Sequence, residues 1–311
     1  MIPPAFVDRL KLLYSEDDLK VILDSFSSSV EALPIRINSL KSSIDEVERV
    51  FKVEGVGMVP VLWAPDVFIL KNIHKDVLSR HELVSNGKIY QQALSSMMPV
   101  IVLDPKPGEY ILDACAAPGS KTTQLSAMMQ AKGHLVAVEA VKARFFRLKA
   151  VVDLLGAVNV SCKLCDVRRF RPLDDILFDR ILVDAPCSSE GRFKSDDSKS
   201  TGYWSVRKIK EMSFKQKGIL MSASRLLKPG GVLVYATCTF APEENEEVVD
   251  WFLRKSEGLF SLEEVSLPGI LRLPGVLRWG RDEYAKDIMK CWRVKPDQMY
   301  TGFFIAKLRK L

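Results

Sequence analysis

The sequence lacks the segments that mark membrane and secreted proteins. It contains no apolar run of about 18 residues, the length that a membrane-spanning helix needs. The first residues combine neither the basic nor the apolar stretch of a secretory signal. Acidic residues such as Asp8 and Glu16 come too early for an acid-poor transit peptide. We therefore expect a cytoplasmic protein without membrane segments.

Histidine is also scarce, with 3 in 311 residues, whereas cysteine occurs 6 times. In a cytosolic chain, cysteines serve as core residues, metal ligands or nucleophiles more often than as disulfides. Cys162 and Cys165 have the spacing of a metal-binding pair, but no second pair of cysteines or histidines accompanies them. We therefore expect no metal site, and we interpret Cys162 as a buried strand residue.

The composition is that of a globular protein, with 47% hydrophobic and 27% charged residues. A chain of this length has room for two domains. The net charge of +6 permits a polyanionic partner without requiring one. Composition therefore leaves the function open, and the motifs decide it.

The first part of the chain mixes helical and extended patterns. We expect amphipathic helices over 5–25, a strand over 33–38, a helix over 44–52, and strand segments over 61–63 and 67–70. Pro65 and Asp66 are expected to separate the last two segments. These elements predict a small N-terminal α/β domain over residues 1–85.

From residue 109, strands alternate with helices. The expected strands are 110–113, 135–139, 158–164, 178–184, 232–237 and 302–306, and the expected helices are 120–129, 142–155, 206–227 and 243–255. Near-continuous apolar strands between helices indicate a parallel sheet that is covered on both faces. Ligands of such sheets bind beyond the carboxyl ends of the strands. We therefore expect one catalytic domain over residues 86–311, with its site at those ends.

The strand that ends at Asp113 leads into a run of small residues and then into a helix N-terminus, which suits an anionic group. The dinucleotide motif G-x-G-x-x-G and the phosphate loop are both missing. Glu139 and Asp166 end the next two strands, where they are placed to accept from ribose hydroxyls and an adenine amine. S-adenosyl-L-methionine fits this pattern better than a dinucleotide. The alternative is a plain strand-to-helix turn with carboxylates that cap helices.

Two cysteines follow two further strand ends. Cys187 lies in Asp184-Ala185-Pro186-Cys187, and Cys238 follows Thr237. If these strands are neighbours in the sheet, both thiols reach the same crevice. The alternative for either cysteine alone is a small buried residue.

These motifs together resemble the RNA 5-methylcytosine methyltransferases of the Sun family. The resemblance covers roughly residues 33–311, and it includes the segments 113–122, 184–188, 237–246, 90–96 and 302–307. It implies a class I S-adenosylmethionine-dependent methyltransferase with a Rossmann-like, mostly parallel sheet and a small N-terminal RNA-recognition-like domain. It also implies methylation of carbon 5 of a cytosine in rRNA or tRNA.

The resemblance also implies roles for individual residues. Cys238 corresponds to the nucleophile, Cys187 to the cysteine that assists product release, and Asp184 to a contact of the base and the methyl donor. The corresponding cofactor contacts are Cys115, Ala116, Ala117, Pro118, Gly119, Ser120, Lys121, Glu139, Asp166 and Asp184. The chain departs from the family at Ser189, where glycine is common, and at Asp297, where histidine is frequent.

Residues 192–217 are rich in lysine and arginine, which suits contacts with RNA phosphates. The candidates are Arg192, Lys194, Lys199, Arg207 and Lys208. Tyr203 and Trp204 are candidates for stacking on bases, and the alternative is a solvated helix face with core aromatics. Rival functions are a tRNA or DNA methyltransferase with another target atom, and a non-catalytic RNA-binding assembly factor. We expect a monomer.

Overall fold

The computed structural model describes residues 2–27, 33–172 and 175–311. The chain divides into two compact units. Unit 1 comprises Met1–Glu31, Val183–Ser266 and Ile270–Leu311, and unit 2 comprises Ala32–Leu182 and Leu267–Gly269. The chain passes from unit 2 into unit 1 along the strand β8 (Phe178–Asp184). The division into domains 1–85 and 86–311 stays a prediction.

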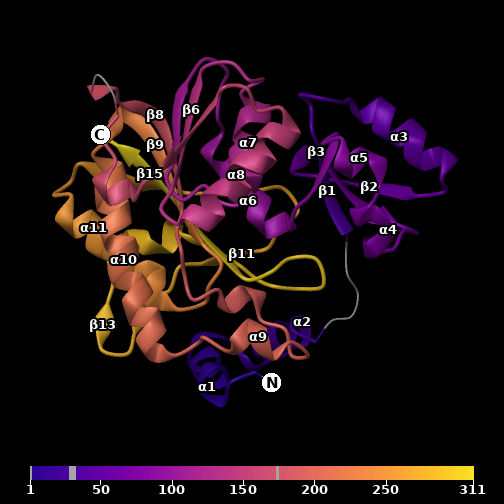
Figure 1. The fold of residues 1–311 in the computed structure, drawn as a ribbon. Helices are drawn as coiled ribbons and strands as arrows, with labels where there is room; N and C mark the ends of the chain where they lie inside the picture. Colours follow the sequence, from indigo (N-terminus) through magenta and orange to yellow (C-terminus); the bar gives the residue numbers. More distant parts are fainter. Residues whose placement is uncertain (1, 28–32, 173–174) are drawn as a thin grey trace. The chain divides into compact units, whose positions relative to one another are not determined.

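Unit 2 contains the parallel sheet that the alternation of strands and helices predicts. Its order is β8-β5-β6-β7, and every neighbouring pair in it is parallel. The elements are β5 (Tyr110–Asp113), β6 (His134–Glu139), β7 (Val160–Leu164), α6 (Leu94–Leu103), α7 (Ser120–Met128), α8 (Lys142–Leu155) and the 3-10 segment η1 (Val167–Arg169). Leu148 and Val152 of α8 pack against Ala116, Ala117 and Ala137. This packing secures the loop after β5, and Figure 1 shows α7 and α8 beside β6.

Unit 2 also contains a four-stranded antiparallel sheet, in the order β2-β3-β1-β4. Its elements are β1 (Leu33–Ile37), β2 (Gly57–Val61), β3 (Ala64–Lys71), β4 (Ile89–Gln91), α3 (Ile44–Val53), α4 (Lys75–Ser79) and α5 (Glu82–Ser85). Val47 and Phe51 of α3 pack into the same core as Ile35 and Ile37 of β1. Arg36, which points to the other side of β1, is fully buried and donates from Nη2 to Thr123 Oγ1 of α7 at 3.1 Å. Both faces of this sheet are therefore covered at β1.

The expected break at Pro65 and Asp66 is wrong, because β3 runs through both residues. The pairing of β3 with β1 begins only at Val67, so a proline at position 65 removes no hydrogen bond from that ladder. The pairing of β2 with β3 is also irregular between Pro60 and Val61. A proline is tolerated where pairing is incomplete.

Unit 1 has an antiparallel sheet in the order β11-β14-β15-β9, with β10 paired to β15. The strands are β9 (Leu227–Thr237), β10 (Phe260–Glu263), β11 (Arg272–Pro274), β14 (Trp292–Val294) and β15 (Phe303–Lys310), with a separate hairpin of β12 (Arg278–Trp279) and β13 (Asp282–Glu283). Of these strands, the sequence predicts only β9 and β15. The rest are short and lack clear alternation.

The helices of unit 1 are α1 (Pro4–Leu13), α2 (Glu16–Ser25), α9 (Ser198–Thr201), α10 (Val206–Ser224) and α11 (Glu246–Lys255), with 3-10 segments η3 (Glu190–Arg192), η4 (Pro242–Glu244) and η5 (Lys286–Lys290). Ser205 caps α10 by accepting from Lys208 N. The predicted helix over 206–227 is too long, because β9 already begins at Leu227. Lys310 of β15 donates from Nζ to Leu227 O at 2.7 Å, which supports this early start.

An aromatic cluster joins the two N-terminal helices to the rest of unit 1. Phe6 and Phe26 pack with Phe193 and Phe240, and the Phe6 and Phe193 ring centroids are 5.0 Å apart. Aromatic side chains bury a large apolar area at such edge-to-face contacts. Phe193 and Phe240 each lie a few residues from a predicted catalytic cysteine, so the N-terminal helices support that region.

Two structural features are not seen in the described parts of the chain. No helix there combines the length and apolarity needed to cross a membrane. No group of three or more His, Cys, Asp or Glu side chains there is placed to hold a metal ion. Cys162 instead packs against the cluster that contains Ala117.

Phe6→Ala should lower the free energy of unfolding by about 3–5 kcal/mol, because it removes a ring from a fully packed cluster. Leu12→Ala on the same helix is the matched control, since Leu12 is 77% exposed. Urea unfolding of both variants measures the difference. Equal stabilities of the two variants would contradict the packing role of α1.

Candidate active site

The loop after β5 has the backbone geometry of a ligand-binding turn. Gly119 precedes α7 with φ 110°, in a region that L side chains rarely adopt. A Cβ atom at this position would also lie 3.1 Å from a methyl group of Val151. Thr122 donates to the buried carboxylate of Asp113 at 2.7 Å, which ties the two ends of the loop together. Lys121, a predicted cofactor contact, is buried and donates to Ser96 Oγ at 2.8 Å.

Glu139 is positioned beside this loop by an arginine that the sequence analysis missed. Its carboxylate is 4% exposed and accepts from Val141 N at 2.8 Å. Arg144 Nη1 lies 3.6 Å from Glu139 Oε2, and Arg144 Nη2 donates to Ala117 O at 2.7 Å. Arg144 thus connects Glu139 to the loop at Ala117. The signal for this contact in the sequence is that Arg144 lies in the first turn of the helix that follows Glu139.

Asp166 lies at the end of β7, which is adjacent to β6, and Cys165 N donates to Glu139 O at 3.0 Å. Its carboxylate caps η1 by accepting from Arg168 N and also pairs with the Arg168 guanidinium at 2.6 Å. This carboxylate therefore caps the next segment. Its contact with a cofactor stays a prediction.

The structure brings Cys187 and Cys238 together, with 3.4 Å between their sulfur atoms. Both residues are partly exposed. Ala185 N donates to Ala236 O at 2.9 Å, which sets the end of β8 beside β9. Gly191 N donates to Cys238 O at 2.9 Å and returns the Cys187 loop to the Cys238 loop. Adjacent strand ends therefore place two cysteines, distant in sequence, in contact.

The contact between the two sulfurs makes the thiols chemically different. A hydrogen bond from the Cys187 thiol lowers the pKa of Cys238, because it stabilises the Cys238 thiolate. The same hydrogen bond, together with burial, raises the pKa of Cys187. The pair therefore favours one thiolate at Cys238 and one proton on Cys187. Thiolates, not thiols, are the nucleophilic form of cysteine.

Ser189, a departure from the family pattern, lies next to both sulfurs. Its backbone has φ 60°, the left-handed region in which glycine is most easily accommodated. Its hydroxyl oxygen lies 3.6 Å from Cys238 Sγ and 3.9 Å from Cys187 Sγ. The hydrogen bond between Cys238 Sγ and Ser189 Oγ lowers the pKa of Cys238 further. The serine thus retains the turn and adds a polar group that glycine lacks.

The segments on either side of the cysteines surround two buried acids that the sequence analysis did not single out. Glu190 is 1% exposed and accepts from Trp204 Nε1, Thr239 Oγ1 and Phe240 N. Glu244 is 0% exposed and accepts from Ser188 N and Gln216 Nε2. Burial raises the pKa of Glu190, and it raises that of Glu244 to about 8.

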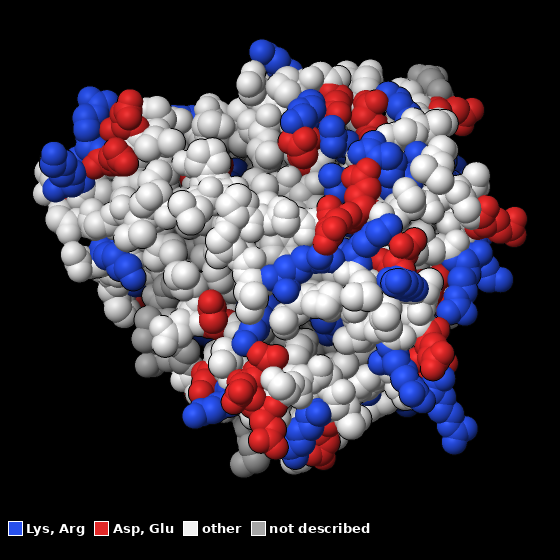
Figure 2. All heavy atoms as spheres, turned by 180° about the vertical axis from the view of Figure 1, so that it is seen from behind, with Lys and Arg blue, Asp and Glu red and all other residues white. Residues whose placement is uncertain are grey.

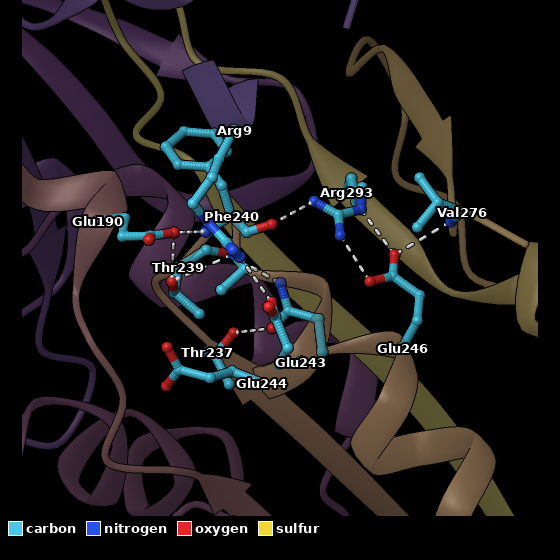
Figure 3. Close-up of polar contacts among 12 residues, drawn as sticks. Arg9, Glu190, Thr237, Thr239, Phe240, Glu243, Glu244, Glu246, Val276 and Arg293 are labelled. Atoms are coloured by element: carbon cyan, nitrogen blue, oxygen red, sulfur yellow. Dashed lines mark hydrogen bonds and ion pairs between the residues drawn. The ribbon is translucent and has the colours of Figure 1, made fainter. Parts of the chain in front are cut away.

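A buried ion pair anchors the chain just beyond Cys238. Arg293 and Glu246 form two hydrogen bonds, at 2.6 Å and 2.5 Å, and their side chains are 4% and 0% exposed. Arg293 also donates to Phe240 O at 2.9 Å, while Glu246 accepts from Val276 N at 3.1 Å. Figure 3 shows Arg293 between Phe240 and Glu246. Sequence position alone does not predict this pair, because Arg293 lies on β14.

The structure also shows the surroundings of Asp184 and of the two aromatic residues that are candidates for stacking on bases. Asp184 ends β8, is partly exposed, and is close enough for its negative charge to raise the pKa of Cys238. Trp204 is partly buried, packs against the aromatic cluster of α1 and donates to Glu190, as the alternative of a core aromatic expects, and its stacking on RNA stays a prediction. Tyr203 beside it is 92% exposed.

Asp297, the other departure from the family pattern, accepts from Met299 N and Tyr300 N and so closes a surface turn.

Solved structures identify the class of protein. The chain is similar to a methyltransferase homolog protein from Pyrococcus horikoshii, with a TM-score of 0.79, 30% identity and 100% of both chains covered. It also shares the fold of NSun6 from Pyrococcus horikoshii solved with SFG, with a TM-score of 0.82, 24% identity, and 99% and 98% of the two chains covered. The parallel sheet and the loop after β5 are those of an S-adenosyl-L-methionine-dependent methyltransferase.

Curated relatives and a family model narrow this class. The chain is 39% identical over 280 residues to a tRNA (cytosine(49)-C(5))-methyltransferase of Pyrococcus abyssi, covering 89% of this chain and 87% of the relative. It is 34% identical over 319 residues to ribosomal RNA small subunit methyltransferase F of Cronobacter sakazakii, covering 99% of this chain and 63% of that longer relative. The model of the 16S rRNA methyltransferase RsmB/F family matches residues 100–309.

The chain belongs to the 16S rRNA methyltransferase RsmB/F family. It is therefore an RNA methyltransferase, and S-adenosyl-L-methionine is its methyl donor. The resemblance to RNA 5-methylcytosine methyltransferases is confirmed. The roles of the individual site residues stay predictions.

Ser189→Gly should raise the pH at which Cys238 becomes reactive, because it removes the hydroxyl beside Sγ. Iodoacetamide alkylation of Cys238, followed by mass spectrometry between pH 5 and 9, measures this midpoint. Stability should change by no more than about 1 kcal/mol, since glycine accepts φ 60°. Ser189→Ala, which also lacks the hydroxyl, should shift the midpoint equally. An unshifted midpoint in both variants would refute the role of the hydroxyl.

Proposed function

We propose that this protein transfers a methyl group to carbon 5 of a cytosine in rRNA or tRNA, through a covalent bond between Cys238 Sγ and carbon 6. The observation that carries this proposal is the 3.4 Å contact between two thiols, in which Cys187 favours the thiolate of Cys238. The printed names of the relatives, a tRNA cytosine-5 methyltransferase and an rRNA methyltransferase, support the substrate class.

The reaction follows from the weak nucleophilicity of cytosine carbon 5. Addition of the Cys238 thiolate to carbon 6 breaks the 5,6 double bond and moves its electron pair onto carbon 5. S-adenosyl-L-methionine, when bound, supplies the methyl group that carbon 5 takes. A base or water then takes the hydrogen of carbon 5 as a proton, its electron pair re-forms the 5,6 double bond, and Cys238 leaves carbon 6 as a thiolate. In this scheme Cys238 attacks, Cys187 assists release, and Asp184 contacts the base and the methyl donor.

The residues of unit 2 fit a nucleoside cofactor. The loop 115–121 combines small side chains with a glycine in a conformation that permits close approach of a ligand to the backbone. The N-terminus of α7 favours a carboxylate. Glu139 is already oriented by Arg144 and Val141. We propose that this loop, Glu139 and Asp166 hold the cofactor, with Asp166 exchanging part of its pairing with Arg168 for the adenine amine.

Unit 1 contains the proposed RNA contacts. Arg192, Lys194, Lys199 and Arg207 are exposed, and Lys208 is partly exposed and paired with Glu211 at 2.9 Å. The face in Figure 2 shows Lys and Arg interspersed with Asp and Glu, so no continuous basic field marks that view. We propose that individual phosphate contacts of residues 192–208, rather than a broad basic surface, hold the RNA. Tyr203 is the proposed aromatic platform for a base.

The four-stranded sheet of unit 2 is proposed to be the RNA-recognition-like domain that the sequence suggests. It has four antiparallel strands, with α3 on one face. Its other face is occupied at Arg36, which is fully buried and bonded to Thr123. RNA contact through this domain would use its strand edges and loops, because the sheet is covered on both faces at β1.

Cys238→Ala should abolish methyl incorporation from labelled S-adenosyl-L-methionine into RNA, because no thiolate adds to carbon 6. Cys187→Ala should accumulate a covalent complex of protein and RNA that resists denaturing electrophoresis, because release is blocked. Cys162→Ala, which changes a cysteine of β7 rather than one of the thiol pair, should methylate RNA without accumulating the complex. Normal turnover of Cys187→Ala without an adduct would show that the assignment is wrong. Absence of methyl transfer in wild type would favour the rival assembly factor.

Replacement of Lys194, Lys199 and Lys208 by alanine should reduce the salt dependence of RNA binding. Each lost phosphate contact should lower the slope of log affinity against log salt by about 0.7 for single-stranded RNA. The control is a variant with the same charge change elsewhere in unit 1, at Lys11, Lys255 and Lys286. Filter binding over a series of salt concentrations gives both slopes. Equal slopes would remove the claim that residues 192–208 contact phosphates.

A further inference from the structure

The peptide groups on both sides of Cys187 are held by one buried pair of side chains, Gln216 and Glu244. Gln216 Nε2 donates to Pro186 O at 2.9 Å and to Glu244 Oε2 at 2.8 Å. Ser188 N donates to Glu244 Oε2 at 3.0 Å. Pro186 and Ser188 are the immediate neighbours of Cys187, so these three hydrogen bonds fix the backbone that carries its thiol.

The pair itself is rigidly mounted. Gln216 lies on the apolar face of α10, and Glu244 ends η4, and both are 0% exposed. The backbone of Glu244 is fixed by Tyr235 Oη, which donates to Glu244 O at 2.6 Å. A buried glutamine and a buried glutamate are both costly unless they are hydrogen-bonded. Both N–H groups of Gln216 Nε2 are used, one on each partner.

We propose that Gln216 and Glu244 position Cys187 for the release of methylated RNA, acting as a clamp on residues 186–188. This inference rests on the proposed function, because it gives the clamp a role in one step of that reaction. Release comes after attack by Cys238, and this nucleophile follows a different strand, β9, where it also has a hydrogen bond with Ser189. Loosening the clamp should therefore slow the breakdown of the adduct more than its formation.

The chemistry of Glu244 shows which substitutions should preserve the clamp. Oε2 accepts the 2.8 Å bond from Gln216 and the shortest bond from Ser188, while Oε1 accepts only a longer bond of 3.3 Å from Ser188. Burial raises the pKa of Glu244 to about 8, while Oε2 accepts from both donors whether or not the acid is ionised. A glutamine at this position presents one amide oxygen to the same two donors. Glu244→Gln should therefore retain the clamp.

The test follows the adduct in single-turnover reactions of the full chain with labelled S-adenosyl-L-methionine and an RNA that the wild type methylates. Glu244→Ala and Gln216→Ala should each slow adduct breakdown by about 10- to 100-fold, the size of effect that misplacement of a reacting group produces. First-turnover methyl transfer should change much less. Glu244→Gln should restore breakdown. The double alanine variant should be no slower than either single variant, because both break the same clamp.

Glu247→Ala is the matched control, since Glu247 lies three residues after Glu244 but its carboxylate pairs with Lys217 at 2.7 Å instead of with residues 186–188. It should behave like wild type. If Glu244→Ala does not fold, as judged by thermal unfolding, Gln216→Ala carries the test, because alanine preserves the helix. Breakdown at the wild-type rate in the folded alanine variants overturns the inference. The inference is also overturned if adduct formation and adduct breakdown slow equally, or if Glu244→Gln does not restore the rate of adduct breakdown.

The outcomes also separate this inference from the proposed function. A wild type that makes no 5-methylcytosine, together with no adduct in Cys187→Ala, overturns both. If Cys187→Ala accumulates the adduct while the clamp variants release it normally, only the clamp is overturned. If the clamp variants accumulate the adduct as Cys187→Ala does, both proposals are supported.

Discussion

The region around the two cysteines depends on the burial of carboxylates, because a buried carboxylate without partners costs several kcal/mol. Glu190, Glu244 and Glu246 are each at most 1% exposed. Each is satisfied by backbone N–H groups of the segments that flank Cys187 and Cys238 or that pack beside them. Every loop that contributes a donor is thereby fixed in place. These hydrogen bonds therefore fix the positions of the two thiols.

The network explains why two thiols of the same kind have different proton affinities. Contact between the sulfurs requires only that the end of β8 and the end of β9 lie side by side. The hydrogen bond between the sulfurs makes the largest difference, because it stabilises the Cys238 thiolate and leaves the proton on Cys187. Burial raises the pKa of Cys187 as well, whereas the hydrogen bond with Ser189 lowers that of Cys238. Contacts and burial, rather than residue type, thus make one cysteine the nucleophile and the other the thiol that keeps its proton.

The same constraint extends to the packing around Phe240. Its N–H is bound by Glu190 and its carbonyl by Arg293, so the backbone just after Cys238 is held from both sides. Gly302 lies against the Phe240 ring so closely that a Cβ atom there would be 2.2 Å from Cζ. The N-terminal helices complete this packing through Phe6 and Phe26. Residues from the start, middle and end of the chain therefore support one turn.

The sequence by itself determined the parallel strands of unit 2, because their apolar runs and helix boundaries are local signals. Gly156, for example, follows α8 in the left-handed conformation that glycine commonly adopts at the end of a helix. The sequence also indicated Cys187 and Cys238, since each follows a strand end with a recognisable motif. It did not predict the short antiparallel strands β10, β11 and β14, whose identity depends on pairing with distant partners.

Only the tertiary structure decided which side chains meet. Arg144 at Glu139, Arg293 at Glu246 and Gln216 at Glu244 join residues whose relation is set by packing, not by spacing in the sequence. The indole of Trp204 packs against Phe6 and donates to Glu190, contacts that no local pattern reveals. Hydrogen-bond partners and pKa shifts arise from burial, and burial is defined only once distant segments are packed together.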